Sequence, residues 1–91
     1  MPSAHGVLNE LAGTLSERVK AQSSVSAHFS TQLLLDVKTL LNALKRGINI
    51  PDTDVDRLIK LRDEIAHATV TSSASAAPFH QTLTDIARKV A

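Results

Sequence analysis

Five basic side chains near the middle of the chain have a spacing that suits binding to phosphate groups. Lys38, Lys45 and Arg46 lie in one segment, and Arg57 and Lys60 follow a short link. On a helix, Lys38 and Lys45 project from one face about 10 Å apart along the axis, because they are seven residues apart. That spacing suits successive phosphates and carries no information about base sequence. The alternative interpretation is a solvated polar face, where lysine is a usual residue.

The aromatic content bears on which nucleic acid such a row of charges would bind. The chain has no Trp or Tyr and only two Phe. Single-stranded nucleic acid is usually held by stacking of its bases on aromatic side chains, whereas duplex RNA is recognised by its shape and backbone. The formal net charge is only +1, but basic residues dominate residues 18–46 and acidic residues dominate residues 52–64. The composition is therefore compatible with a duplex and argues against a single strand.

Arg62 and His67 form a second candidate site. Helical spacing places Arg62 between two apolar seams, where an unpaired buried guanidinium would be costly. Arg62 must therefore form a salt bridge, for instance with Asp36, lie at a solvated helix edge, or belong to a functional site. An arginine can stabilise charge on a phosphate and a histidine can transfer a proton near neutral pH. Arg62 and His67 are accordingly the alternative catalytic residues.

No other catalytic or metal site is predicted. His5, His28 and His80 are expected at the surface, and no two histidines have the i, i+4 spacing of a helical metal site. The chain has no cysteine, no Gly-rich phosphate loop and no nucleophile elbow. We expect no metal, no cofactor and no small-molecule substrate.

The elements that must position these side chains are helices, because apolar residues recur at three- and four-residue steps and strand alternation is absent. The pattern predicts one domain over residues 1–91, with a flexible Ser/Ala loop at 69–78 and helices over about 3–22, 26–46, 53–68 and 79–90. Ser3 is expected to cap the first helix, and Asp52 or Thr53 the third. Gly47 has the right identity and place for the residue just past a helix end.

The second predicted helix is apolar on more than one side. Leu35 stands outside an arc roughly 120° wide that holds its other large apolar residues, which are Leu33, Leu34, Val37, Leu40, Leu41 and Leu44. A two-helix hairpin cannot bury both sides, so the remaining helices or a second copy must do so. We predict an all-α fold: a long antiparallel helical hairpin plus one or two further helices, arranged as a helical bundle or as hairpins that pair between subunits.

The hydropathy pattern predicts neither a membrane span nor a signal peptide. No apolar run approaches the roughly 20 residues that span a bilayer. The N-terminus lacks the charged-then-apolar order of a signal peptide. A soluble cytoplasmic protein without a membrane partner is expected.

The opening MPSAHGVLNELAGTLSERVKA is similar to the start of the small double-stranded-RNA-binding silencing suppressors of insect nodaviruses. The similarity is carried by Met1, Pro2, Ser3, Glu10, Leu11, Val19 and Ala21, and the run from Asp36 and Val37 to Leu40 and Leu44 resembles the second helix of that family. The resemblance implies a dimeric four-helix bundle, a homodimer of long helical hairpins that lays one face along duplex RNA and blocks its processing. It implies a viral protein in the host-cell cytoplasm, with RNA contacts at Lys45 or Arg46 and at Arg57.

The string LRDEIAHA resembles the signature of HEPN domains, many of which are RNA-cutting toxins. Arg62 and His67 match the arginine and histidine of that signature, and Asp63 stands in place of the usual asparagine. This resemblance implies a ribonuclease centre, commonly formed across a dimer. A plain helical interaction module is the third interpretation, and a non-enzymatic duplex-RNA-binding protein is the leading one.

Overall fold

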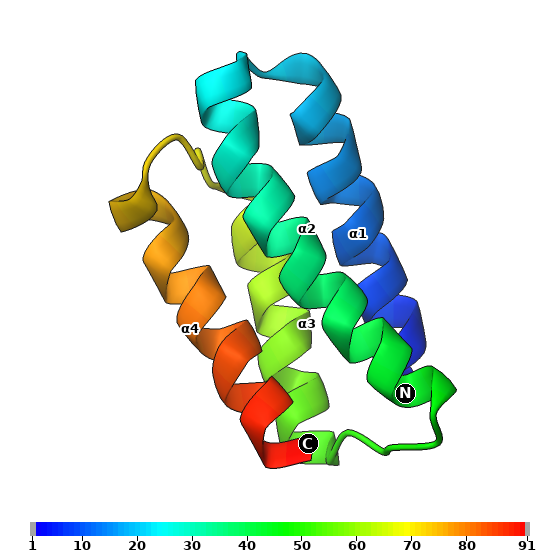
Figure 1. Ribbon diagram of the computed structural model, residues 1–91. Coiled ribbons are helices and arrows are strands. Elements are labelled where there is room, and N and C mark those ends of the chain that lie inside the picture. Colours follow the sequence, from blue (N-terminus) through cyan, green and yellow to red (C-terminus); the bar gives the residue numbers. More distant parts are fainter. Residues whose placement is uncertain (1, 91) are drawn as a thin grey trace.

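The computed structural model describes residues 2–90, which form four helices and no strand (Figure 1). The helices are α1 (Ala4–Ala21), α2 (Ser24–Lys45), α3 (Asp52–His67) and α4 (Ser73–Val90). α1 and α4 each pack against both α2 and α3, so the helices surround the core in the order α1, α2, α4, α3. Successive helices run in opposite directions, which makes α2 parallel to α4. The all-α fold is confirmed.

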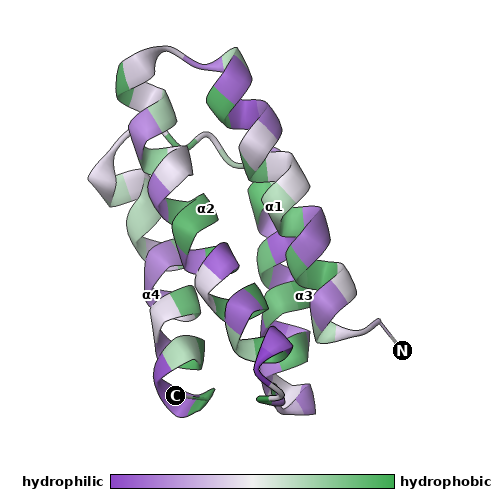
Figure 2. Cartoon of the chain, turned by 45° about the vertical axis from the view of Figure 1, so that its right-hand side comes forward, coloured by the Kyte–Doolittle hydropathy of each residue, from purple (hydrophilic) through white to green (hydrophobic). Residues whose placement is uncertain are grey.

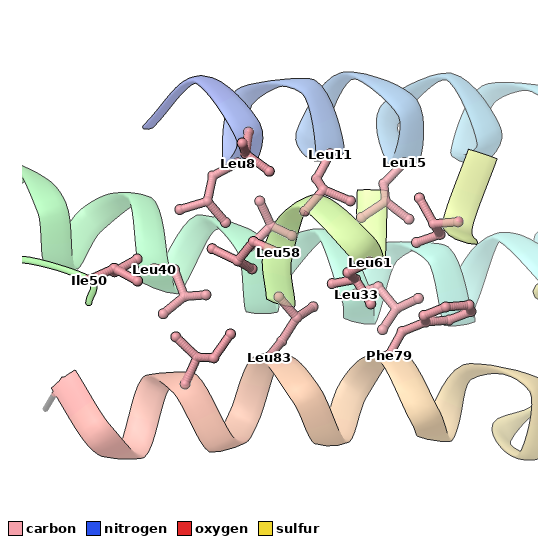
Figure 3. Close-up of a cluster of buried hydrophobic side chains, with 14 of the residues drawn as sticks. Leu8, Leu11, Leu15, Leu33, Leu40, Ile50, Leu58, Leu61, Phe79 and Leu83 are labelled. Carbon is pink, nitrogen blue, oxygen red and sulfur yellow. The ribbon is translucent and has the colours of Figure 1, made fainter. Parts of the chain in front are cut away.

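The core is a row of leucines and a few other apolar side chains that all four helices direct inward (Figure 3). Leu8, Leu11 and Leu15 come from α1, three and four residues apart, as a buried helical stripe requires. Leu33 and Leu40 of α2 face them. α3 and α4 complete the core mainly with Leu58, Leu61, Ile65, Phe79, Leu83 and Ile86.

The apolar arc of α2 is covered within the same chain. α2 packs against α1 on one side and against α4 on the other. Leu35, which stands outside the arc and was expected to need a neighbour, is not covered in this way and remains 51% exposed. The arc itself gives no reason for a second subunit, and the homodimer stays a prediction.

The ends of α1 and α2 follow the local sequence. The Ser3 hydroxyl accepts a hydrogen bond of 3.0 Å from the Gly6 amide, which confirms Ser3 as the cap of α1. Gly47 has a φ of 87°, a left-handed conformation that favours glycine. Its amide and that of Ile48 donate to the carbonyls of Leu44 and Ala43, the paired bonds of a Schellman motif. The predicted end of this helix is confirmed.

One predicted cap and one predicted boundary are wrong. α3 begins at Asp52, with Pro51 at the cap position and no side-chain cap, so neither Asp52 nor Thr53 has the capping role. α4 begins at Ser73, so the second half of the predicted loop 69–78 is helical. The Ser75 amide donates to the Ser72 hydroxyl (3.2 Å), and the Ser72 amide donates to the Ser75 hydroxyl (3.0 Å). This reciprocal pair stabilises the start of α4 as a capping box does.

Candidate nucleic-acid interface

A groove of about 300 Å³ runs along the outer face of α1 and α2. We call it the α1–α2 groove, and it is lined by His5, Asn9, Lys38, Leu41, Asn42 and Lys45. The lining contains two lysines and three uncharged polar side chains but no acidic one. It can therefore attract an anion and offer hydrogen bonds to its oxygens.

The hairpin geometry explains why these residues meet. In an antiparallel hairpin, residues at similar distances from the turn lie near one another. The turn between α1 and α2 is at residues 22–23, which brings Asn9 beside Lys38 and His5 beside Asn42. The His5 ring and the Asn9 amide are also hydrogen-bonded to each other at 3.1 Å. Lys38, Asn42 and Lys45 form a polar line along α2, and His5 and Asn9 of α1 lie beside it.

The charged side chains of α2 that face this groove are basic. Asp36 is the only acidic residue of α2, and its carboxylate is bound to the His80 ring of α4, with 2.6 Å between Oδ2 and Nδ1. Lys38 and Lys45 are exposed, and neither takes part in an ion pair formed within residues 2–90. Both ammonium groups are therefore available to a ligand.

The other three predicted phosphate-binding residues lie elsewhere. Arg46 lines a small groove between α2 and α4, together with Ala87 and Val90. Arg57 and Lys60 line a groove between α3 and α4. The structure brings Lys38 and Lys45 together and separates them from Arg46, Arg57 and Lys60.

Arg57 belongs to a network of two bases and two acids between α3 and α4. Its Nη1 lies 2.7 Å from Asp85 Oδ2 and 3.2 Å from Oδ1 of the buried Asp54. Lys89 Nζ is 3.4 Å from the same oxygen of Asp54. The hydrogen bond with Asp85 raises the pKa of Arg57 and lowers the pKa of Asp85. Because its charge is balanced by these carboxylates, Arg57 is a weaker candidate for phosphate binding.

This network of ion pairs is expected to make the stability of the fold depend on pH in the acidic range. The lowered pKa means that ionised Asp85 stabilises the fold above its ordinary pKa of 3.8, and that this stabilisation is lost as the pH falls through the lower folded value. Asp85→Asn should therefore weaken the pH dependence of stability below about pH 4. Urea unfolding at a series of pH values measures this slope. The matched control is Asp56→Asn on the exposed surface of α3, and an equal effect of the two substitutions would contradict the role of the network.

Arg62 has a structural partner, but not the predicted one. Its Nη1 lies 3.1 Å from Glu10 Oε2 of α1, and its Nε lies 3.5 Å from Asp63 Oδ1. Asp36 is bound to His80 instead. The pairing with Glu10 joins α1 to α3 and explains why an arginine stands between apolar seams. His67 is exposed in the last turn of α3.

Arg18 has a role that the sequence did not indicate. Its guanidinium donates to the backbone carbonyls of Ala68, at 2.7 Å, and of Ile65. These carbonyls belong to the C-terminal end of α3, where helical carbonyls lack intrahelical partners and cations are favoured. No local motif identifies this contact, because Arg18 lies about fifty residues before its partners.

The remaining predictions concern histidines, metals and membranes. His5, His28 and His80 are exposed, as predicted. Within residues 2–90, no three histidine or carboxylate side chains gather in a way that could hold a metal ion. None of the four helices described combines the length and apolar character that a bilayer crossing requires.

The comparison with known proteins found no match. No family model, curated protein sequence or solved structure matches the chain.

Proposed function

We propose that this protein binds duplex RNA through the α1–α2 groove, without regard to base sequence. The observation that carries the proposal is the lining of that groove, which holds Lys38 and Lys45 and no acidic side chain. A ligand attracted by such a lining is a polyanion. Duplex RNA is the polyanion implied by the resemblance of the first two helices to silencing suppressors.

The geometry of the groove suits contacts with a phosphate backbone. Lys38 and Lys45 lie on one face of α2, about 10 Å apart along its axis. His5, Asn9 and Asn42 offer further hydrogen bonds between and beside them. The start of α1 lies at the same end of the groove as Lys45, and the unpaired amides of a helix start carry partial positive charge.

The positions of the aromatic side chains favour a duplex over a single strand. Phe79 is buried in the core, and Phe29 lines a different groove, between α2 and α4. Neither can stack on a base at the α1–α2 groove, so contacts with the backbone carry the affinity. A protein bound along the backbone shields the duplex from processing enzymes, which is how it would suppress RNA silencing.

Charge substitutions test the proposal. The double variant Lys38→Ala/Lys45→Ala is expected to raise the Kd for duplex RNA at least about tenfold and to reduce the salt slope by about 2, because each lysine releases about one counterion. Fluorescence anisotropy with two duplexes of unrelated sequence, at a series of salt concentrations, measures both quantities. The matched control is Lys60→Ala, an exposed lysine in the α3–α4 groove.

Two outcomes would contradict this proposal. The first is an absence of binding by the wild-type chain at low salt. The second is a loss of affinity in Lys60→Ala as large as the loss in the double variant.

Incubation of the chain with single-stranded RNA tests the ribonuclease interpretation. The ion pair of Arg62 with Glu10 favours a structural role for that arginine, so the RNA is expected to remain intact. Cleavage of single-stranded RNA that His67→Ala abolishes in a folded protein would establish the ribonuclease instead.

A further inference from the structure

One part of the surface is poor in formal charge. Residues 21–35 and 68–84 contain no Asp, Glu, Lys or Arg, although such residues make up 21% of the chain. These two stretches form the first half of α2 and the first two-thirds of α4, and the parallel helices bring them to the same end of the bundle (Figure 1). Coloured by hydropathy, these turns are mostly pale or green (Figure 2).

This charge-poor surface contains an apolar groove of about 370 Å³ between α2 and α4. Phe29, Leu33, Ala76 and Ala77 supply its apolar lining, and it is also lined by His28 and His80. The space exists because α4 presents two alanines opposite the larger side chains of α2. A groove of this kind can accept an apolar side chain from another molecule.

An exposed apolar side chain lies directly beside the groove. Val25 is 72% exposed and is one of two large apolar side chains that residues 2–90 leave exposed. It precedes Phe29 by four residues on α2, so the two lie on the same face of the helix, one turn apart. The surface therefore has a protruding valine and a neighbouring apolar groove.

We propose that a second copy of this chain docks on this surface, with Val25 of each copy inserted into the α2–α4 groove of the other. A two-fold axis makes the contact reciprocal, since a surface with a protrusion next to a groove is complementary to itself. The scarcity of charge on both copies reduces the repulsion that like charges would cause, and depletion of charge is typical of the core of an interface. The carboxylate next to the groove, Asp36, is bound to His80 of the same chain. Each copy keeps its own four-helix bundle, unlike the hairpin pairing that the sequence predicted.

Sedimentation equilibrium at concentrations up to roughly 1 mM, a range that populates even a weak dimer, tests this proposal. The wild-type chain is expected to reach twice its monomer mass of 9.7 kDa. Val25→Glu should raise the dimer Kd at least about tenfold without unfolding the chain, because the residue is exposed and an acid suits the first turn of a helix. The double variant Val25→Glu/Ala77→Lys should restore the dimer through an ion pair between the copies.

The matched control is Leu35→Glu, the same change at the other exposed apolar side chain, which should leave the dimer intact. A wild-type chain that stays monomeric over the whole range would overturn the proposal. A dimer disrupted by Leu35→Glu and unaffected by Val25→Glu would overturn it as well. The surface lies on a different helix pair from the α1–α2 groove, so this proposal and the RNA-binding proposal can fail independently.

Discussion

Leu58→Ala is expected to lower the free energy of unfolding by about 3 to 5 kcal/mol, because it leaves a cavity in a fully enclosed core. Leu58 has no exposed surface and lies near the middle of the bundle, among side chains from the other helices (Figure 3). A domain of this length has a total stability of roughly 5 to 13 kcal/mol, so the substitution removes a large share of it. Urea unfolding followed by circular dichroism measures the change.

The control for Leu58→Ala is the same chemical change at Leu35. That side chain is half exposed, so little apolar area is lost from the core and the expected change is below about 1 kcal/mol. Equal losses at the two positions would contradict the packing of α3 into the core.

Arg18→Ala is expected to lower the free energy of unfolding by about 2 to 3 kcal/mol, because hydrogen bonds from a charged donor to two carbonyls are lost. The guanidinium joins α1 to the end of α3 through Ala68 and Ile65. An ammonium lacks the fork that reaches both carbonyls at once, so Arg18→Lys should recover only part of the loss. Urea unfolding gives the size of the effect.

Hydrogen exchange shows whether the effect of Arg18→Ala is local. Amides at the end of α3 and in the following link, residues 65–70, should lose protection first. Unchanged stability in Arg18→Ala, or full recovery in Arg18→Lys, would contradict the proposed role of the guanidinium.

The helices were predictable because each carries its own local signal. The leucine spacing of α1, the cap at Ser3 and the end at Gly47 are all properties of neighbouring residues. The start of α4 was missed because a run of serine and alanine looks like a loop until Ser72 and Ser75 are seen to cap each other. Pro78 added to the error, because a proline interrupts most helices, whereas here it lies inside α4.

Contacts between helices were harder to predict. A short loop makes α1 and α2 neighbours, and this is enough to place His5 and Asn9 beside Lys38 and Asn42. The local sequence does not indicate whether α3 packs on α1 or on α2. The ion pair of Arg62 with Glu10 of α1 could therefore not be predicted.

The candidate site was predictable in part for the same reason. Lys38 and Lys45 share a face because seven residues are close to two helical turns, whereas consecutive residues such as Lys45 and Arg46 project about 100° apart. Arg46 therefore enters a different groove from Lys45. Arg57 forms ion pairs with Asp54 and Asp85, and the pair with Asp85 depends on the packing of α3 against α4. Arg57 is therefore a weaker candidate for phosphate binding than its sequence position suggests.

The most direct test of the RNA-binding proposal is a titration of the isotope-labelled chain with duplex RNA, followed by the chemical shifts of its backbone amides. The largest shifts are expected at residues 5–9 and 38–45, which line the α1–α2 groove. Residues 57–64 and 73–80 should change little, and added salt should reverse the shifts. Shifts centred on residues 57–67, or none at low salt, would contradict RNA binding through this groove.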